Sequence, residues 1–157
     1  MTFNPESKMD QDKQIDTLNS LLETTIDSVK GYRNSAEELS SERLRQIFEQ
    51  NAQDRGEVVE RLREEVRRLG GDPADSGSAM GQVHHVWEDL KGAITGHDNE
   101  AIVKQTEAAE DYLKTQYEDA LKKLDGDARQ VVEQCYQKVR QGHDEISSLK
   151  HSMEAHS

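Results

Sequence analysis

The sequence has little of what disulfide-stabilised or β-rich proteins use. It contains one cysteine, two prolines and 4% aromatic residues in 157 positions. A single cysteine excludes an intramolecular disulfide, and Cys135 falls on an apolar stripe, where it is expected to pack as a small hydrophobic residue. Aromatic residues are enriched in strands, so their shortage disfavours a β architecture. Both prolines lie outside the long periodic stretches, which are therefore free to form helices.

Long hydrophobic runs are also absent. No window approaches the ~18 apolar residues that a membrane span needs, and the first residues contain no apolar run of the kind found in signal peptides. We therefore expect a cytoplasmic protein that does not bind membranes.

Positive charge is scarce, since the formal net charge is -12 at pH 7. Such a charge repels nucleic-acid phosphates unless a local basic patch overrides it. The arginines of the segment 61–68 alternate with glutamates, a pattern typical of a solvated helix face. We therefore expect no nucleic-acid partner.

Hydrophobic residues make up only 32% of the chain, but they are spaced like the buried stripes of helices. Such regular spacing argues against disorder. The stripes predict helices at about 12–39, 42–69, 99–124 and 127–154, which together make one bundle over 12–157 after a flexible tail at 1–11. The first stripe shows the alternating steps of three and four residues: Ile15, Leu18, Leu22, Thr25, Val29, Tyr32, Ala36 and Leu39.

Short turns join these helices in pairs. Ser40 and Ser41 can cap the second helix, Gly70-Gly71 can end it, and Asp127 with Gln130 resembles a capping box for the fourth. The connection 70–98 is long enough to run the full length of the bundle and contains a predicted short helix at about 79–94, anchored by Trp87. The expected fold is all-α: a ferritin-like four-helix bundle of two antiparallel hairpins joined by a long crossover.

Polar residues at or beside the stripes support the crossover. If the third helix starts beside the Ser40-Ser41 turn, six polar residues reach one level, and Arg55 gains Glu110 as a partner instead of lying unpaired in the core. We call these six the predicted polar layer: Tyr32, Asn51, Arg55, Glu107, Glu110 and His143. Three glycines adjoin its members, namely Gly31, Gly56 and Gly142. They provide either room for large side chains or a small cavity for a ligand or metal.

The predicted polar layer lacks the ligands of a di-iron centre. Such bundles supply a glutamate from each of two helices and Glu-x-x-His from each of the other two. No Glu-x-x-His occurs in the second or fourth helix, and Asp27 and Glu37 fall off the stripe of the first. We therefore predict a buried ion-pair network without a cofactor and without catalytic residues. The alternative is one iron, manganese or zinc ion bound by Glu107, Glu110 and His143.

Several segments resemble a bacterial family of ferritin-like four-helix bundles classed as a domain of unknown function. They are Gly31-Tyr32 with Ala36-Glu37, Leu69-Gly70-Gly71-Asp72-Pro73, Gly77-Ser78 through Val83-His84 to Trp87-Glu88-Asp89-Leu90-Lys91, Glu107-Ala108-Ala109-Glu110-Asp111, and His143-Asp144. The resemblance implies a bacterial cytosolic protein with a ferritin-like fold and an association with stress or stationary phase. It implies no activity.

Two functions follow as hypotheses. The first is a non-enzymatic bundle that acts through self-assembly into a homo-oligomer or through a protein partner, in the setting of stress. The second is a degenerate ferritin-like metalloprotein with a single metal ion at Glu107, Glu110 and His143.

Overall fold

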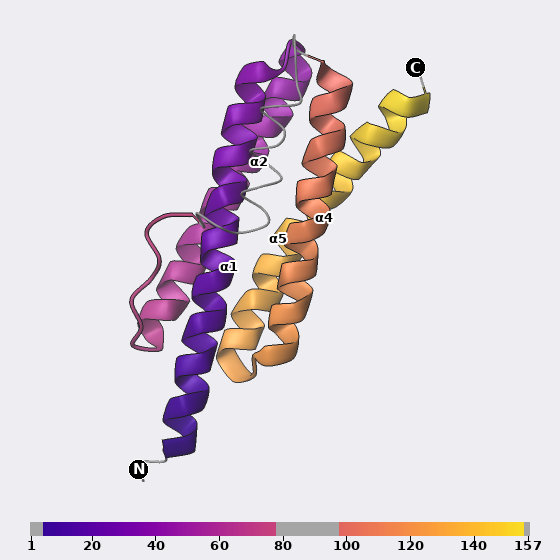
Figure 1. Cartoon of the computed structure of the whole chain (residues 1–157). Coiled ribbons are helices and arrows are strands. Elements are labelled where there is room, and N and C mark those ends of the chain that lie inside the picture. The colour runs from indigo at the N-terminus through magenta and orange to yellow at the C-terminus, as the bar shows by residue number, and fades with distance from the viewer. Residues whose placement is uncertain (1–4, 78–97, 156–157) are drawn as a thin grey trace.

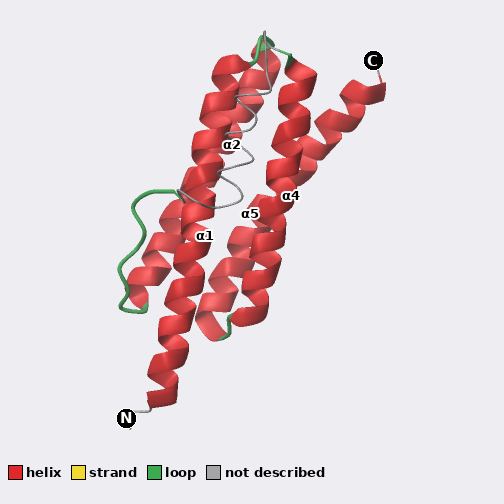
Figure 2. Cartoon of the chain, viewed as in Figure 1, coloured by secondary structure: helices red, strands yellow, loops and turns green. Residues whose placement is uncertain are grey.

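The computed structural model describes residues 5–77 and 98–155, which form four α-helices (Figure 1). The described residues outside these helices are loops and turns (Figure 2). The all-α fold expected from the apolar stripes is confirmed. The helices are α1 at Pro5–Glu38, α2 at Glu42–Arg68, α4 at Asn99–Lys123 and α5 at Gly126–Ala155.

One predicted helix start is wrong. Helix α1 begins at Pro5 instead of about residue 12, so residues 5–11 are helical and not a flexible tail. Proline suits the first turn of a helix, and the Gln11 side chain donates a hydrogen bond to the Leu69 carbonyl at 2.6 Å. Helix α5 begins at Gly126, within one residue of the predicted start, and Asp127 lies in its first turn and not at the cap. The predicted helix at 79–94, with Trp87, lies outside the described residues.

The two ends of α2 show the expected capping chemistry. The Ser41 hydroxyl accepts a hydrogen bond from the Leu44 amide at 3.3 Å. At the other end Gly70 has a φ of 86°, a left-handed conformation that favours glycine. The Gly70 amide donates to the Arg67 carbonyl and the Gly71 amide to the Val66 carbonyl, both at 2.9 Å, as in a Schellman motif. These contacts end α2 and turn the chain toward α1.

The chain that leaves α2 runs back along α1. The Ala74 amide donates to Asn19 Oδ1 at 2.9 Å, and further on Gly77 lies against Asp27. At the far side of the crossover, the Asn99 side chain accepts from the Ser40 amide and donates to the Ser40 hydroxyl, both at 3.0 Å. Helix α4 therefore starts beside the α1–α2 turn and runs parallel to α2. The expected full-length crossover is confirmed.

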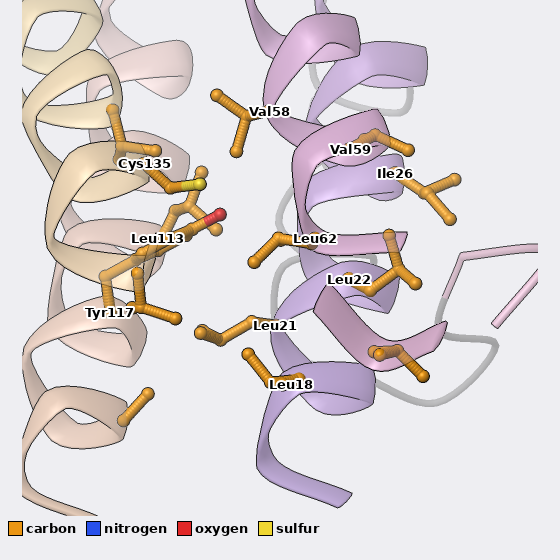
Figure 3. Close-up of a cluster of buried hydrophobic side chains, with 14 of the residues drawn as sticks. Leu18, Leu21, Leu22, Ile26, Val58, Val59, Leu62, Leu113, Tyr117 and Cys135 are labelled. Carbon is orange, nitrogen blue, oxygen red and sulfur yellow. The ribbon is translucent and has the colours of Figure 1, made fainter. Parts of the chain in front are cut away.

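Each helix has two main neighbours. Helix α1 packs against α2 and α4, and α5 packs against α4 and α2. Their apolar side chains form a larger cluster near the α4–α5 turn and a smaller cluster near the α1–α2 turn. Figure 3 shows side chains of the larger cluster pointing toward one another from both hairpins, among them Leu62 and Tyr117. Cys135 belongs to this cluster, and burial raises the pKa of its thiol to about 11.

A polar level separates the two clusters. In α2 the smaller cluster ends at Ala52 and the larger begins at Val58, with Arg55 between them. Glu110 in α4 and Gly142 in α5 occupy the corresponding gaps in their helices, and all three are buried. Within the described helices, this polar level divides the hydrophobic core near the middle of the bundle.

Candidate functional site: a buried ion pair beside an interhelical cavity

Arg55 and Glu110 form a bidentate ion pair at the polar level, which we call the central ion pair. Arg55 Nη1 donates to Glu110 Oε1 and Nη2 donates to Oε2, each at 2.8 Å. The side chains are 3% and 1% exposed. Because water does not reach these buried groups, the two parallel charge-assisted hydrogen bonds compensate the charges of the guanidinium and the carboxylate.

The surroundings of Arg55 hold its guanidinium in place. Nη1 also donates to Ser28 Oγ at 2.6 Å, and Cζ lies 5.4 Å from the centre of the Tyr32 ring, within range of a cation–π interaction. Phe48 packs edge-on against Tyr32, with ring centres 5.4 Å apart. Burial alone lowers the pKa of Arg55, but the Glu110 carboxylate outweighs this effect and raises it, so the guanidinium stays charged.

Tyr32 is neutral in this environment. Burial is the largest cause that raises the pKa of its hydroxyl, and the nearby Glu110 carboxylate raises it further. A phenol that keeps its proton adds no third charge to the central ion pair. Tyr32 therefore contributes its ring face and packing to the site.

Gly142 makes room for the guanidinium. A Cβ atom built on Gly142 would lie 2.7 Å from Arg55 Nη2 and 3.6 Å from Glu110 Oε2. The first distance is too short for a real contact, so any larger residue would displace the arginine. Of the two explanations for the interior glycines, space for a large polar side chain holds at Gly142. At Gly56 a Cβ atom would meet nothing within 4 Å.

Next to the central ion pair, a cavity of about 300 Å³ lies between α2 and α5. Arg55, Asn51 and Gly142 are among the residues that line it. Asn51 is only 6% exposed, and its Nδ2 has no hydrogen-bond partner among the described residues. A buried donor without an acceptor costs about 1–3 kcal/mol. Nδ2 itself has almost no exposed surface, so this donor is a cost to the folded state beside the cavity.

Glu107 and His143 do not join the central ion pair. Glu107 Oε1 accepts a hydrogen bond from Lys150 Nζ at 2.8 Å. Partial burial raises the pKa of Glu107, but the bonds from Lys150 and Ser147 lower it overall. His143 Nε2 lies 2.5 Å from Asp111 Oδ1 at the bundle surface. The prediction that all six polar residues share one buried layer is therefore wrong for these two.

The described residues at the polar level do not fit a metal centre. Among the described residues, no three histidine, cysteine, aspartate or glutamate side chains are placed to hold a metal ion together. The alternative ligand set of Glu107, Glu110 and His143 is not assembled, because each side chain has a different partner. Arg55 puts a positive charge where a di-iron centre needs carboxylates. No chemical step through such a centre can be derived from this donor set.

Asp27 of α1 is buried although it lies off the stripe, as expected. The residue is 4% exposed and lies against Gly77 of the crossover. The position faces the loop that runs along α1 after the end of α2. The spacing of apolar residues within the helices does not reveal a contact with a loop. Sequence reasoning also missed Ser28, a small hydroxyl one residue off the stripe that nevertheless reaches Arg55.

These helices and their crossover define the class: a ferritin-like four-helix bundle with an arginine–glutamate pair at its centre. The sequence profile described as a domain of unknown function, DUF2383, matches residues 13–123. The chain belongs to this family.

One solved structure supports the fold. It is described as a crystal structure of ferritin-like, diiron-carboxylate proteins from Bacillus anthracis str. Ames, with 17% sequence identity and a TM-score of 0.62. The match covers 93% of this chain and 96% of the other. At this identity the likeness shows the fold alone.

Two further findings complete the comparison. No curated protein matches the chain significantly. None of the helices in the described part of the chain combines the length and apolar character that crossing a membrane requires.

Proposed function

We propose that this protein is a non-enzymatic ferritin-like bundle that acts through association with copies of itself or with another protein. The observation that carries the proposal is the central ion pair. In place of carboxylates and histidines around a metal, the middle of the bundle holds an arginine bound by one glutamate, one serine and a tyrosine ring. This arrangement is self-contained and sets the alignment of the helices.

The ends of the bundle support association. In Figure 1 the first turns of α1 extend past the α4–α5 turn, and the last turns of α5 lean away from α4. Leu149 and Met153, near the end of α5, are only partly buried by the smaller cluster. Helix ends with incomplete neighbours in one chain can gain neighbours in a second chain.

Two measurements on one preparation test the proposal. Protein purified without chelators is expected to carry far less than one metal ion per chain by elemental analysis, and light scattering is expected to give a molar mass above that of a monomer. Stoichiometric iron, manganese or zinc would overturn the non-metal assignment. A strict monomer at all concentrations, with no protein captured by cross-linking in the native cell, would overturn the association.

A pair of variants locates the association surface. Met153→Asp puts a charge on the partly buried face of α5, whereas Ser152→Asp puts the same charge on an exposed neighbour. The first is expected to shift the assembly toward smaller species and the second is not. Equal behaviour of the two variants would show that this end of α5 is not the interface.

The family resemblance adds a setting to the proposal: a bacterial, cytoplasmic protein of the stress or stationary-phase response. An immunoblot of growing and starved host cells tests this part. The protein is expected to accumulate in starved cells and to fractionate with the cytoplasm. Constant abundance through growth would contradict the stress assignment and leave the association test unaffected.

A further inference from the structure

Helix α5 is packed unequally along its length. Before Gly142 it buries side chains of the larger cluster: Ala128, Val132, Cys135 and Val139. Beyond Gly142, Ile146 is buried, whereas Leu149 and Met153 are only partly buried. Gly142 has no side chain to pack, and glycine adapts readily to a bend of the backbone. Figure 1 shows the turns after this point leaning away from α4. The C-terminal half of α5 is therefore held by fewer apolar contacts than the first half.

Polar contacts also join this half of α5 to α4. Glu107 of α4 accepts hydrogen bonds from Lys150 and Ser147. His143 Nε2 lies 2.5 Å from Asp111 Oδ1 of α4. Serine does not titrate, and lysine and glutamate keep their charges at neutral pH, whereas histidine gains or loses a proton there. The contact of His143 is therefore the one that responds to pH in this range.

Both ring nitrogens of His143 face carboxylates. Nε2 faces Asp111, and Nδ1 lies 3.1 Å from Asp144 Oδ1. A neutral imidazole carries one N–H, so it can donate to one of these carboxylates while the lone pair of the other nitrogen faces an oxygen. The imidazolium donates to both, and its charge strengthens both bonds. The observed arrangement therefore fits the protonated ring.

The charged groups around His143 come from each helix that packs against α5. Helix α4 contributes Asp111 and Lys114, α5 itself contributes Asp144, and α2 presents the central ion pair one residue away at Gly142. Burial lowers the pKa of His143, and Lys114 lowers it further, but the bonds to the two aspartates raise it overall. The ring thus loses its proton above the ordinary pKa of histidine, about 6.5.

We propose that His143 is a pH-sensitive latch for the C-terminal half of α5. When the ring is protonated, it holds residues 143–155 against α4. When the proton is lost, these turns separate from α4 more often by bending at Gly142. The side chains that α5 buries before Gly142 do not depend on the latch, so the first half of the helix keeps its packing. This motion takes place within one chain and does not rest on the association proposed above.

Amide hydrogen exchange of the full chain measures the opening, once the rates are corrected for the intrinsic effect of pH on exchange. Between about pH 6 and pH 8, protection of the amides at 144–153 is expected to fall by about three- to fivefold relative to the amides at 130–139, as befits the loss of one partly exposed ion pair. An equal change in both segments would show a general destabilisation and overturn the latch. Unchanged protection of 144–153 would overturn it as well.

Variants assign the effect to His143. His143→Gln cannot titrate, so protection of 144–153 is expected to be independent of pH and to equal that of the original chain at pH 8. His151→Gln removes an exposed histidine of the same helix and is expected to behave like the original chain. A pH dependence that persists in His143→Gln, or disappears in His151→Gln, would contradict the proposal. If His143→Gln fails to fold, Asp111→Asn provides the second test, because it removes the carboxylate on α4 and is expected to weaken the pH dependence.

Discussion

Gly142 and Gly56 show at the residue scale how the same residue type serves different purposes. Both lie inside helices, where glycine is disfavoured relative to alanine. At Gly142 the place that a Cβ atom would take lies against Arg55 Nη2, whereas at Gly56 a Cβ atom would meet nothing within 4 Å. Their sequence context, beside predicted polar residues, did not distinguish the two. The difference between the two glycines depends on whether a side chain of a neighbouring helix lies against the glycine.

Gly142→Ala is expected to destabilise the protein by about 1–3 kcal/mol, because the new methyl group displaces a guanidinium held by three hydrogen bonds. Gly56→Ala is the matched control and is expected to stabilise by roughly 0.5–1 kcal/mol through helix propensity alone. Urea unfolding followed by circular dichroism measures both. If both alanines stabilise the protein equally, Arg55 does not occupy the space at Gly142.

His143 predicts a pH dependence of stability. Burial lowers its pKa, but hydrogen bonds to Asp111 and Asp144 outweigh this and raise it above the ordinary value. A histidine with a raised folded-state pKa contributes its full stabilisation below the unfolded-state pKa of about 6.5. That contribution is lost as pH rises through the folded-state pKa. The original chain should therefore lose stability between pH 6 and 8 relative to His143→Gln.

The measurement is the urea midpoint across this pH range for both proteins. His151→Gln changes an exposed histidine of the same helix and serves as the control. Parallel pH curves for the original chain and His143→Gln would mean that the contacts with Asp111 and Asp144 do not stabilise the imidazolium.

At the scale of the elements, local signals in the sequence marked the ends of α2 well and the start of α1 poorly. Ser41 and Gly70 act within a few residues of the chain, so their chemistry can be recognised without the fold. The first turns of α1 are polar. Pro5 suits a helix start, but polar residues after it look the same in a tail and in a helix that extends past its neighbours.

The start of α4 depends on a contact between distant segments, Asn99 with Ser40. Asn99→Ala removes the hydrogen bond that the Ser40 amide donates to Asn99 Oδ1 and the one that Asn99 Nδ2 donates to the Ser40 hydroxyl. The expected loss is about 0.5–1.5 kcal/mol, together with roughly tenfold faster hydrogen exchange of the Ser40 amide. Asn34→Ala, an exposed amide in α1, is the control. Equal exchange rates in the two variants would show that this contact does not hold the crossover end.

At the scale of the whole molecule, the central ion pair and the Ser28 hydroxyl together join three helices. Ser28 comes from α1, Arg55 from α2 and Glu110 from α4, and the fourth helix leaves space for them at Gly142. Because it lies between two apolar clusters, a sliding of one hairpin along the other would separate the charges. The pair therefore specifies the alignment of the hairpins as well as contributing to stability.

Arg55→Met is expected to cost about 3–5 kcal/mol, because Glu110 would remain buried without its partner. The double variant Arg55→Met with Glu110→Leu should recover most of that loss. A double-mutant cycle by urea unfolding measures the coupling. The exposed pair Lys138–Glu57, which also joins two helices, is the control and should show a coupling below about 1 kcal/mol. Similar coupling for both pairs would contradict a buried central ion pair.

The sequence by itself determined the helices, their pairing into hairpins and the crossover, because apolar spacing and caps act locally and because an unpaired Arg55 would be too costly in a core. It also indicated that Arg55 and Glu110 belong together. Only the tertiary structure decided which polar residues share the centre. Neighbouring positions on a helix point in different directions, so a shift of one residue separates a core position from a surface position. For this reason Ser28 contacts Arg55 at the centre, whereas Glu107 and His143 pair with residues nearer the surface. The cavity beside Asn51 likewise depends on how α2 and α5 pack, which the sequence does not reveal.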